Sequence, residues 1–306
     1  MNFSTNTRSD QVNGILLMLI AVMLFAFMDA AVKWLGADYP ISQILFFRCV
    51  VALIPITGFI YHAGGLAVLK TKRPFVHLLR CVVGMSAMYF IFSAFTVMRL
   101  PDAVAILFSA PLFMTALAIP ILGEKVGIRR WSAILVGFVG VIIIVNPGAG
   151  IISAGALYAL AGSLAMAMAM IIVRHLSSTE HPVAITLYFT LSGALIGLVL
   201  VMVEGWITPP LFDLGLLIMV GLLGGFAQFA MTKAFRHTEV ALVAPIEYSA
   251  IIWTTLLSYF IWDDFPETRV WVGITIIVLS GFYMVRRESA LSLSRKRKLP
   301  KLRIRG

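Results

Sequence analysis

The chain has 306 residues, of which 60% are hydrophobic and only 12% are charged, and its mean hydropathy is +0.98. Soluble globular proteins have about 45–50% apolar and about 25% charged residues, so this composition excludes a soluble enzyme, a disordered chain and a secreted disulfide scaffold. The net charge of +10 comes mostly from a C-terminal tail and from loops on one side. We therefore expect an integral membrane protein that does not bind nucleic acid.

Ten apolar segments follow one another along the chain. About 20 apolar residues in a helix cross the hydrocarbon core, and a helix satisfies its backbone hydrogen bonds internally, as hydrocarbon requires. Tyr39-Pro40 and Pro209-Pro210 mark turns between segments. The first segment contains Asp29 and nine more follow it, so we do not expect a cleaved signal peptide. The predicted spans of this all-α membrane protein are 13–35, 41–61, 75–97, 103–122, 131–146, 153–174, 183–203, 211–235, 240–262 and 269–286.

The distribution of Lys and Arg predicts the orientation, because cytoplasmic loops carry an excess of these residues. With the N-terminus inside, 20 of the 24 lie on the inner side and 3 on the outer side, while Arg48 lies within a span. Both termini are therefore expected in the cytoplasm. The basic tail, residues 287–306, is expected to attract anionic lipids of the cytoplasmic (inner) membrane.

The second half of the sequence repeats the first at an offset of about 140 residues. Residues 14–35 align with residues 155–176, and several polar and Trp positions match in register. These pairs include Gly14 with Gly155, Lys33 with Arg174, Glu124 with Asp264 and Trp131 with Trp271. Five spans are an odd number, so two consecutive copies cross the membrane in opposite directions. The pattern thus predicts two inverted five-helix repeats, at 13–146 and 153–286, an architecture in which transporters bind substrate near the midplane.

Two motifs carry a resemblance to a known family. The run PLFMTALAIPILGE, residues 111–124, leads into the Trp131 helix, and the run APIEY, residues 244–248, precedes a helix end at Asp263-Asp264. With the ten-span layout, these motifs resemble the EamA-type transporters of the drug/metabolite transporter superfamily. Asp263-Asp264 stands where that family more often has Gly-Glu. The resemblance covers residues 13–286 and implies a secondary transporter.

Ionisable residues within spans mark functional candidates, because each is costly in the membrane unless paired or wet. Asp29 and Arg48 lie at matched depths, roughly 10 Å below the predicted outer edge. The pair is either a buried ion pair that holds two helices together or a site where Arg48 binds a substrate carboxylate, since a guanidinium binds a carboxylate in two places. Arg80, in the third span, is a further candidate.

Glu247 is the acidic candidate of the second half. Pro245 weakens the helix just before it, and Gln228 and Arg80 lie at a similar depth. Glu247 either pairs with one of those two residues or serves proton coupling or amine binding. Four aromatic residues are candidates for lining a substrate cavity, with helix packing as the alternative for each: Tyr89, Tyr188, Tyr248 and Trp253.

Small residues spaced four apart occur in the seventh and eighth spans. Gly193 and Gly197 form one pair, and Gly221 and Gly225 form the other. Such spacing lets helix backbones approach closely. We therefore expect these glycines to serve packing rather than substrate binding.

Several alternatives remain after these observations. The sequence has neither a phosphate-binding Gly-x-x-x-x-Gly-Lys-Ser/Thr loop nor a His or Cys metal motif, so we expect no enzyme activity, cofactor or metal. The resemblance implies transport of an amino-acid-like, nucleoside-like, vitamin or drug substrate. The alternatives are an importer of a larger planar metabolite such as S-adenosylmethionine or riboflavin, a lipid-modifying membrane enzyme, and a non-transporting subunit. Protons are a possible coupling partner, and the protein is expected to be a monomer or homodimer.

Overall fold

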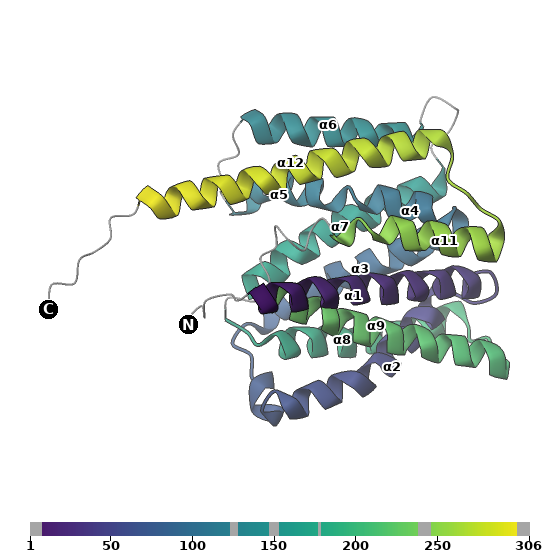
Figure 1. Ribbon diagram of the computed structural model, residues 1–306. Coiled ribbons are helices and arrows are strands. Elements are labelled where there is room, and N and C mark those ends of the chain that lie inside the picture. Colours follow the sequence, from purple (N-terminus) through teal and green to yellow (C-terminus); the bar gives the residue numbers. More distant parts are fainter. Residues whose placement is uncertain (1–7, 123–127, 147–152, 177–178, 238–245, 299–306) are drawn as a thin grey trace, which may run out of the picture.

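The computed structural model describes residues 8–122, 128–146, 153–176, 179–237 and 246–298, and in these ranges the chain has helices and no β-strand. The helices lie side by side in one bundle (Figure 1). The first half contains α1 (Arg8–Leu35), α2 (Ile41–His62), the 3-10 helix η1 (Gly65–Leu69), α3 (Pro74–Val97), α4 (Leu100–Leu107), α5 (Ala110–Leu122) and α6 (Ile128–Val145). The second half contains α7 (Ala154–Leu176), α8 (Pro182–Glu204), α9 (Leu211–His237), α11 (Ala250–Trp262) and α12 (Thr268–Lys298).

Seven helical stretches of the described residues are long and apolar enough to cross a membrane, and one of them, Leu100–Leu117, runs through α4 into α5. Three shorter apolar helices, Trp131–Val145, Ala250–Trp262 and Thr268–Tyr283, follow in the places of the remaining predicted spans. The prediction of an all-helical, multi-pass membrane protein is confirmed. The number of ten spans stays a prediction.

The fourth predicted span, 103–122, is two helices rather than one. α4 ends at Leu107, a turn covers Phe108 and Ser109, and α5 begins at Ala110. Pro111 explains the interruption, because proline has no backbone N–H to bond the carbonyl of Leu107.

The ninth predicted span is interrupted at the corresponding place. Ile246 and Glu247 are helical, Tyr248 and Ser249 form a turn, and α11 begins at Ala250. Pro245, predicted to weaken this helix, lies outside the described residues. The two turns are 140 residues apart, the spacing of the sequence repeat, and the rings of Phe108 and Tyr248 meet edge to face with centroids 5.0 Å apart.

Helices of the first half pack mainly on helices of the second half. The main pairs are α1 with α9, α3 with α7, α2 with α8 and α6 with α12, and α4 packs on α11. The four main pairs are unchanged when each helix is exchanged for its counterpart in the other half: α1 with α9 becomes α7 with α3. α6 and α12 form one edge of the bundle and α2 forms the opposite edge (Figure 1).

Glycines bring α2 into close contact with both α8 and α9. A Cβ atom at Gly197 of α8 would lie 2.9 Å from the Cα of Phe46, and one at Gly225 of α9 would lie 2.7 Å from the Cγ of Pro55. Both distances are too short for a real Cβ contact, so only glycine permits this approach. The predicted packing role of the two glycine pairs is confirmed.

The two ends of the bundle are defined by the helices that begin and end there. α1 begins and α12 ends at the same end (Figure 1), here called the near end. α1 and α3 finish, and α4 and α12 start, at the opposite end, here called the far end. The predicted tail, 287–306, continues α12 as far as Lys298, and its last residues lie outside the described part of the chain.

Replacing Gly221 by Ala tests the packing of α2 on α9. The new Cβ would collide with the Cβ of Val51 and lie 2.9 Å from the backbone oxygen of Phe47, so we expect a loss of about 1–3 kcal/mol in unfolding free energy. Gly215→Ala, on the same helix, meets nothing within 4 Å and should be neutral or slightly stabilising. Thermal unfolding of the two purified variants measures the difference; equal stability contradicts the packing role.

Candidate functional site

Asp29 of α1 and Arg48 of α2 place opposite charges inside the bundle. Arg48 is 6% exposed, and its Nε has no hydrogen-bond partner. Asp29 is half-buried and lies within electrostatic reach of Arg48. Among the described residues no ion pair within 4.0 Å joins the two side chains, so their charges interact across a gap rather than in contact.

Gly224 of α9 provides the space that Arg48 occupies. A Cβ atom at Gly224 would lie 3.1 Å from the Nε of Arg48 and 3.0 Å from the Sδ of Met28. Arg48 is the seventh residue after Ile41, about 10 Å along α2 from the far end. Three helices, α1, α2 and α9, therefore meet at this guanidinium.

Arg80 brings a second guanidinium into the interior. Its side chain extends along α3, because a Cβ atom at Gly84 would collide with the Nη1 of Arg80. The Cζ lies 4.2 Å from the ring centroid of Phe189 on α8, within the range of a cation–π contact. Nε and Nη1 are buried without a hydrogen-bond partner, and the charge of Arg80 lies within electrostatic reach of Arg48.

Sequence reasoning missed Phe189. The repeat aligns Tyr188-Phe189 with Phe46-Phe47, but an aromatic residue within an apolar span carries no sign of a polar contact. Only the fold shows that the ring faces Arg80.

Glu247 and Tyr248 lie at the interruption before α11. Glu247 is half-buried, and the described part of the chain provides no charged partner for its carboxylate. The Tyr248 ring contacts Phe108, and its hydroxyl occupies the space beside Gly281 of α12. The predicted pairing of Glu247 with Arg80 or Gln228 is not observed among the described residues, although Gln228, half-buried on α9, has an interaction of its own.

The other aromatic candidates make contacts away from Asp29 and Arg48, and the Tyr188 ring lies 4.8 Å from the ring of His77. At the near end, the Tyr188 hydroxyl donates a hydrogen bond of 2.7 Å to the Leu69 carbonyl. Trp253 packs on an apolar cluster that includes Met18 and Ala230, and Tyr89 packs against the main core. These contacts favour the packing alternative for all three residues.

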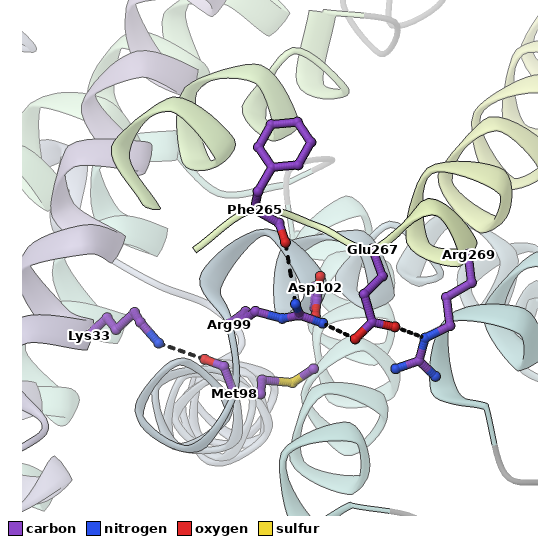
Figure 2. Close-up of polar contacts among 7 residues, drawn as sticks. All are labelled: Lys33, Met98, Arg99, Asp102, Phe265, Glu267 and Arg269. Atoms are coloured by element: carbon purple, nitrogen blue, oxygen red, sulfur yellow. Dashed lines mark hydrogen bonds and ion pairs between the residues drawn. The ribbon is translucent and has the colours of Figure 1, made fainter. Parts of the chain in front are cut away.

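A polar network lies at the far end of the bundle (Figure 2). Arg99 is its centre: Nε donates to Asp102 at 2.8 Å, and Nη2 donates to Glu267 at 2.9 Å. Lys33 donates separately to the Met98 carbonyl at 2.8 Å. The network joins α1 and the α3–α4 connection of the first half to the α11–α12 connection of the second. Its members are Lys33, Met98, Arg99, Asp102, Phe265, Glu267 and Arg269.

Two further contacts cross the halves at the far end. The Tyr39 hydroxyl donates to Asp213 at 2.7 Å, and this bond raises the pKa of Tyr39 to about 12. The Gln43 amide exchanges two hydrogen bonds with the backbone of Ile207, of 2.7 and 3.0 Å. The contacts therefore connect the α1–α2 turn and the start of α2 to the α8–α9 connection and the start of α9.

The near end has its own contacts between the halves. Glu180 accepts a 3.2 Å hydrogen bond from the backbone N–H of Lys72 and lies 3.9 Å from His77. Arg73 lies 2.6 Å from the ring of His175. These contacts join the start of α3 to the end of α7 and the connection to α8.

The acidity of Glu267 provides a test of the far-end network. Hydrogen bonds from Arg269 and Arg99 lower the pKa of Glu267 from its ordinary value of 4.5. A carboxylate with a lowered pKa stabilises the fold above its ordinary value and loses that contribution as the pH falls through the lowered value.

We therefore expect Glu267→Gln to melt at a lower temperature than the unchanged protein at pH 7, with the difference disappearing below about pH 4. Glu204→Gln, which changes an exposed carboxylate at the same end, is the matched control. A melting temperature of Glu267→Gln equal to that of the unchanged protein at pH 7 contradicts the network's role.

The described residues contain no group of three or more His, Cys, Asp or Glu side chains able to hold a metal. Cys49 and Cys81 are free and buried. The chemistry available is therefore that of charged and aromatic side chains within an apolar bundle, which defines a polytopic membrane protein with a polar interior. Comparison with known proteins identifies its family.

The chain belongs to the EamA-like transporter family, whose model matches twice, at residues 12–146 and 153–286. The predicted resemblance is confirmed, and the protein is a transporter rather than an enzyme. A solved crystal structure matches with a TM-score of 0.65 at 17% identity, covering 90% of this chain and 98% of the other; this likeness supports the fold alone.

Three relatives illustrate the range of the family. The S-adenosylmethionine uptake transporter of Rickettsia prowazekii is 30% identical over 90% of this chain and 93% of its own. The riboflavin transporter of Rhizobium johnstonii is 26% identical over 92% and 93%. The pseudopaline exporter CntI of Pseudomonas aeruginosa is 27% identical over 90% and 96%. These relatives carry small molecules, and they include both importers and exporters.

Proposed function

We propose that this protein is a secondary transporter that moves a small organic metabolite across the cytoplasmic membrane by alternating access. The observation that carries the proposal is the cluster of charges inside the apolar bundle, with Asp29, Arg48 and Arg80 on three different helices. Charged groups at such depth are costly unless paired or wet, and they commonly mark substrate or ion pathways. The substrate site is proposed among these three side chains.

We propose that the two family-matched halves are inverted five-helix repeats that rock against one another. The interruptions at Phe108–Ser109 and Tyr248–Ser249 support this, because discontinuous helices line transporter sites at the interface between repeats. The packing of each half mainly on the other supports it too. The far-end network then holds one access route closed and has to break for that end to open.

S-adenosylmethionine is the first compound that we propose to test. The relative that carries it is 30% identical over 90% of this chain. The compound combines a nucleoside with an amino acid, and a buried guanidinium pairs well with a carboxylate. Riboflavin is the second compound, because a riboflavin transporter aligns over 92% of the chain.

Uptake and exchange of these two compounds in reconstituted vesicles tests the proposal. The unchanged protein should carry at least one of them, and Arg48→Ala should reduce its transport about tenfold or more. Asp29→Asn combined with Arg48→Gln distinguishes two roles: recovery of both folding and transport indicates a structural pair, whereas a folded but inactive protein indicates substrate binding. Unimpaired transport by Arg48→Ala removes Arg48 from the site.

We propose that Glu247 couples transport to protons. It is a carboxylate within a predicted span, lies beside a helix interruption and has no charged partner in the described part of the chain; acidic residues in such places form proton relays. Coupling requires that proton binding differ between the two facing states.

Glu247→Gln keeps the size of the side chain but cannot release a proton. The variant should exchange substrate across the membrane at the normal rate yet fail to accumulate it when a pH gradient is imposed. Accumulation at the level of the unchanged protein excludes Glu247 from coupling and leaves Asp29 as the remaining candidate.

We propose that both termini face the cytoplasm. Lys and Arg are in excess on the side of the membrane that holds the N-terminus, which supports this orientation. The start of α1 and the end of α12 also lie at the same end of the bundle (Figure 1). A C-terminal reporter active only outside the cytoplasm should stay silent, and the same reporter inserted between α8 and α9 should be active. The reverse pattern contradicts the orientation.

A further inference from the structure

We propose that Arg48 and Arg80 together form a receptor for a carboxylate group of the substrate near the middle of the membrane. The inference rests on the proposed transport function and names the chemical class of what is carried. It assigns Arg80 to the substrate site together with Phe189 and Gly84, which hold its guanidinium in place.

The position of Arg80 in the bundle is the first argument. Its Nη1 lies at the level of Gly84, which is ten residues, or about 15 Å, from the start of α3 at the near end. Arg48 lies about 10 Å from the far end on α2. Both guanidinium groups therefore lie in the middle part of a hydrocarbon layer about 30 Å thick.

The missing partner of Arg80 is the second argument. Nε and Nη1 are buried and donate no hydrogen bond, although a guanidinium has five N–H donors that a carboxylate fits in pairs. Glu180, in the connection that leads into α8, is already engaged by Lys72 and His77. The ring of Phe189 attracts the cation on one side only, so the donors themselves remain available.

The charge balance is the third argument. Arg48 repels Arg80. Like charges held in one apolar interior without an intervening anion are unfavourable, which favours an anion bound between the two arginines.

Two glycines keep the receptor open. A side chain at position 84 would displace the Arg80 guanidinium, and one at position 224 would press on Arg48. Neither glycine adopts a backbone conformation that requires glycine. The space that a side chain would need is taken by Arg80 and the Phe189 ring at Gly84, and by Met28 and Arg48 at Gly224.

The proposal distinguishes among the compounds carried by relatives. An amino acid or an amino acid conjugate such as S-adenosylmethionine carries the required carboxylate, whereas riboflavin carries none. Asp29, within electrostatic reach of Arg48, offers a carboxyl group to the ammonium group of such a substrate. We therefore infer that the transported compound is a carboxylate with an adjacent cationic group.

Thermal unfolding of the purified protein with matched probes tests the receptor. The probes are S-adenosylmethionine, methionine, tryptophan and tyrosine, each paired with its decarboxylated amine. A ligand that binds only the folded state raises the melting temperature. We expect at least one acid, and not its amine, to raise the melting temperature. Arg80→Gln should weaken the binding of that acid at least tenfold. Arg73→Gln, at the start of the same helix, should leave the binding of that acid unchanged.

Arg80→Met separates binding from packing, because it keeps an unbranched stem beside Phe189 and removes the charge. Without ligand, this variant should melt at the same or a higher temperature than the unchanged protein, and it should lose the response to the acid. A strongly lowered melting temperature shows a structural Arg80 and overturns the proposal. So does a response to acid and amine alike, a response that survives Arg80→Gln, or the lack of any carboxylate-dependent response in the unchanged protein.

Vesicle transport distinguishes this inference from the proposed function. If the vesicles take up riboflavin and the protein binds each acid and its amine equally well, the receptor is wrong and the transport function still holds. Carboxylate-dependent binding without transport of any probe supports the receptor and contradicts transport.

Discussion

An unpaired charge in hydrocarbon costs about 2.5–3.5 kcal/mol even by the mildest measures, and the interior of this protein contains several charges without close partners. The Nε of Arg48 donates no hydrogen bond, Arg80 has two such nitrogens, and Asp29 interacts with Arg48 only across a gap. The helices that surround these groups have to stabilise them without neutralising them. The cation–π contact with Phe189 and the attraction between Asp29 and Arg48 provide part of this stabilisation, and a substrate is proposed to provide the remainder.

Close packing between the two halves keeps these charges in a narrow space. α2 lies against Gly193 and Gly197 of α8 and against Gly221 and Gly225 of α9, so its backbone approaches both neighbours closely. Because Arg48 is on α2 and Gly224 is on α9, a movement of one half relative to the other changes the surroundings of the guanidinium directly. The same movement alters the far-end network, which joins Arg99 to Glu267 across the halves (Figure 2).

The interruptions of the fourth and ninth segments place irregular backbone in the interior. Irregular backbone is tolerated within a membrane protein where protein or a polar cavity surrounds it. Here the edge-to-face contact between Phe108 and Tyr248 brings the two interruptions together. Glu247 lies beside this contact, which connects the proposed coupling residue to the part of each half where the helix is least regular.

Particular residues show how much of this site could be predicted from the sequence. Asp29 and Arg48 were predictable as neighbours, because antiparallel helices joined by a short turn bring residues at equal depth together. Tyr188 and Trp253 were equally good candidates for lining a substrate cavity. In the structure the Tyr188 hydroxyl donates to a backbone carbonyl, and Trp253 packs on apolar groups. Which face of a helix turns toward the interior depends on its neighbours, and a uniformly apolar span has no amphipathic pattern to indicate it.

The sequence by itself determined the membrane class, the helical fold and the family, because hydrophobicity and the cost of unsatisfied backbone groups act on every segment independently of its neighbours. It also indicated the repeat, since the matching positions lie at a constant offset along the chain. Only the tertiary structure decided that Arg80 extends over Gly84 to Phe189, that α4 and α5 are separate helices, and that Arg99 joins the two halves. These features depend on side chains from distant segments meeting in space, and a contact between α3 and α8 leaves no trace in the local pattern of either helix.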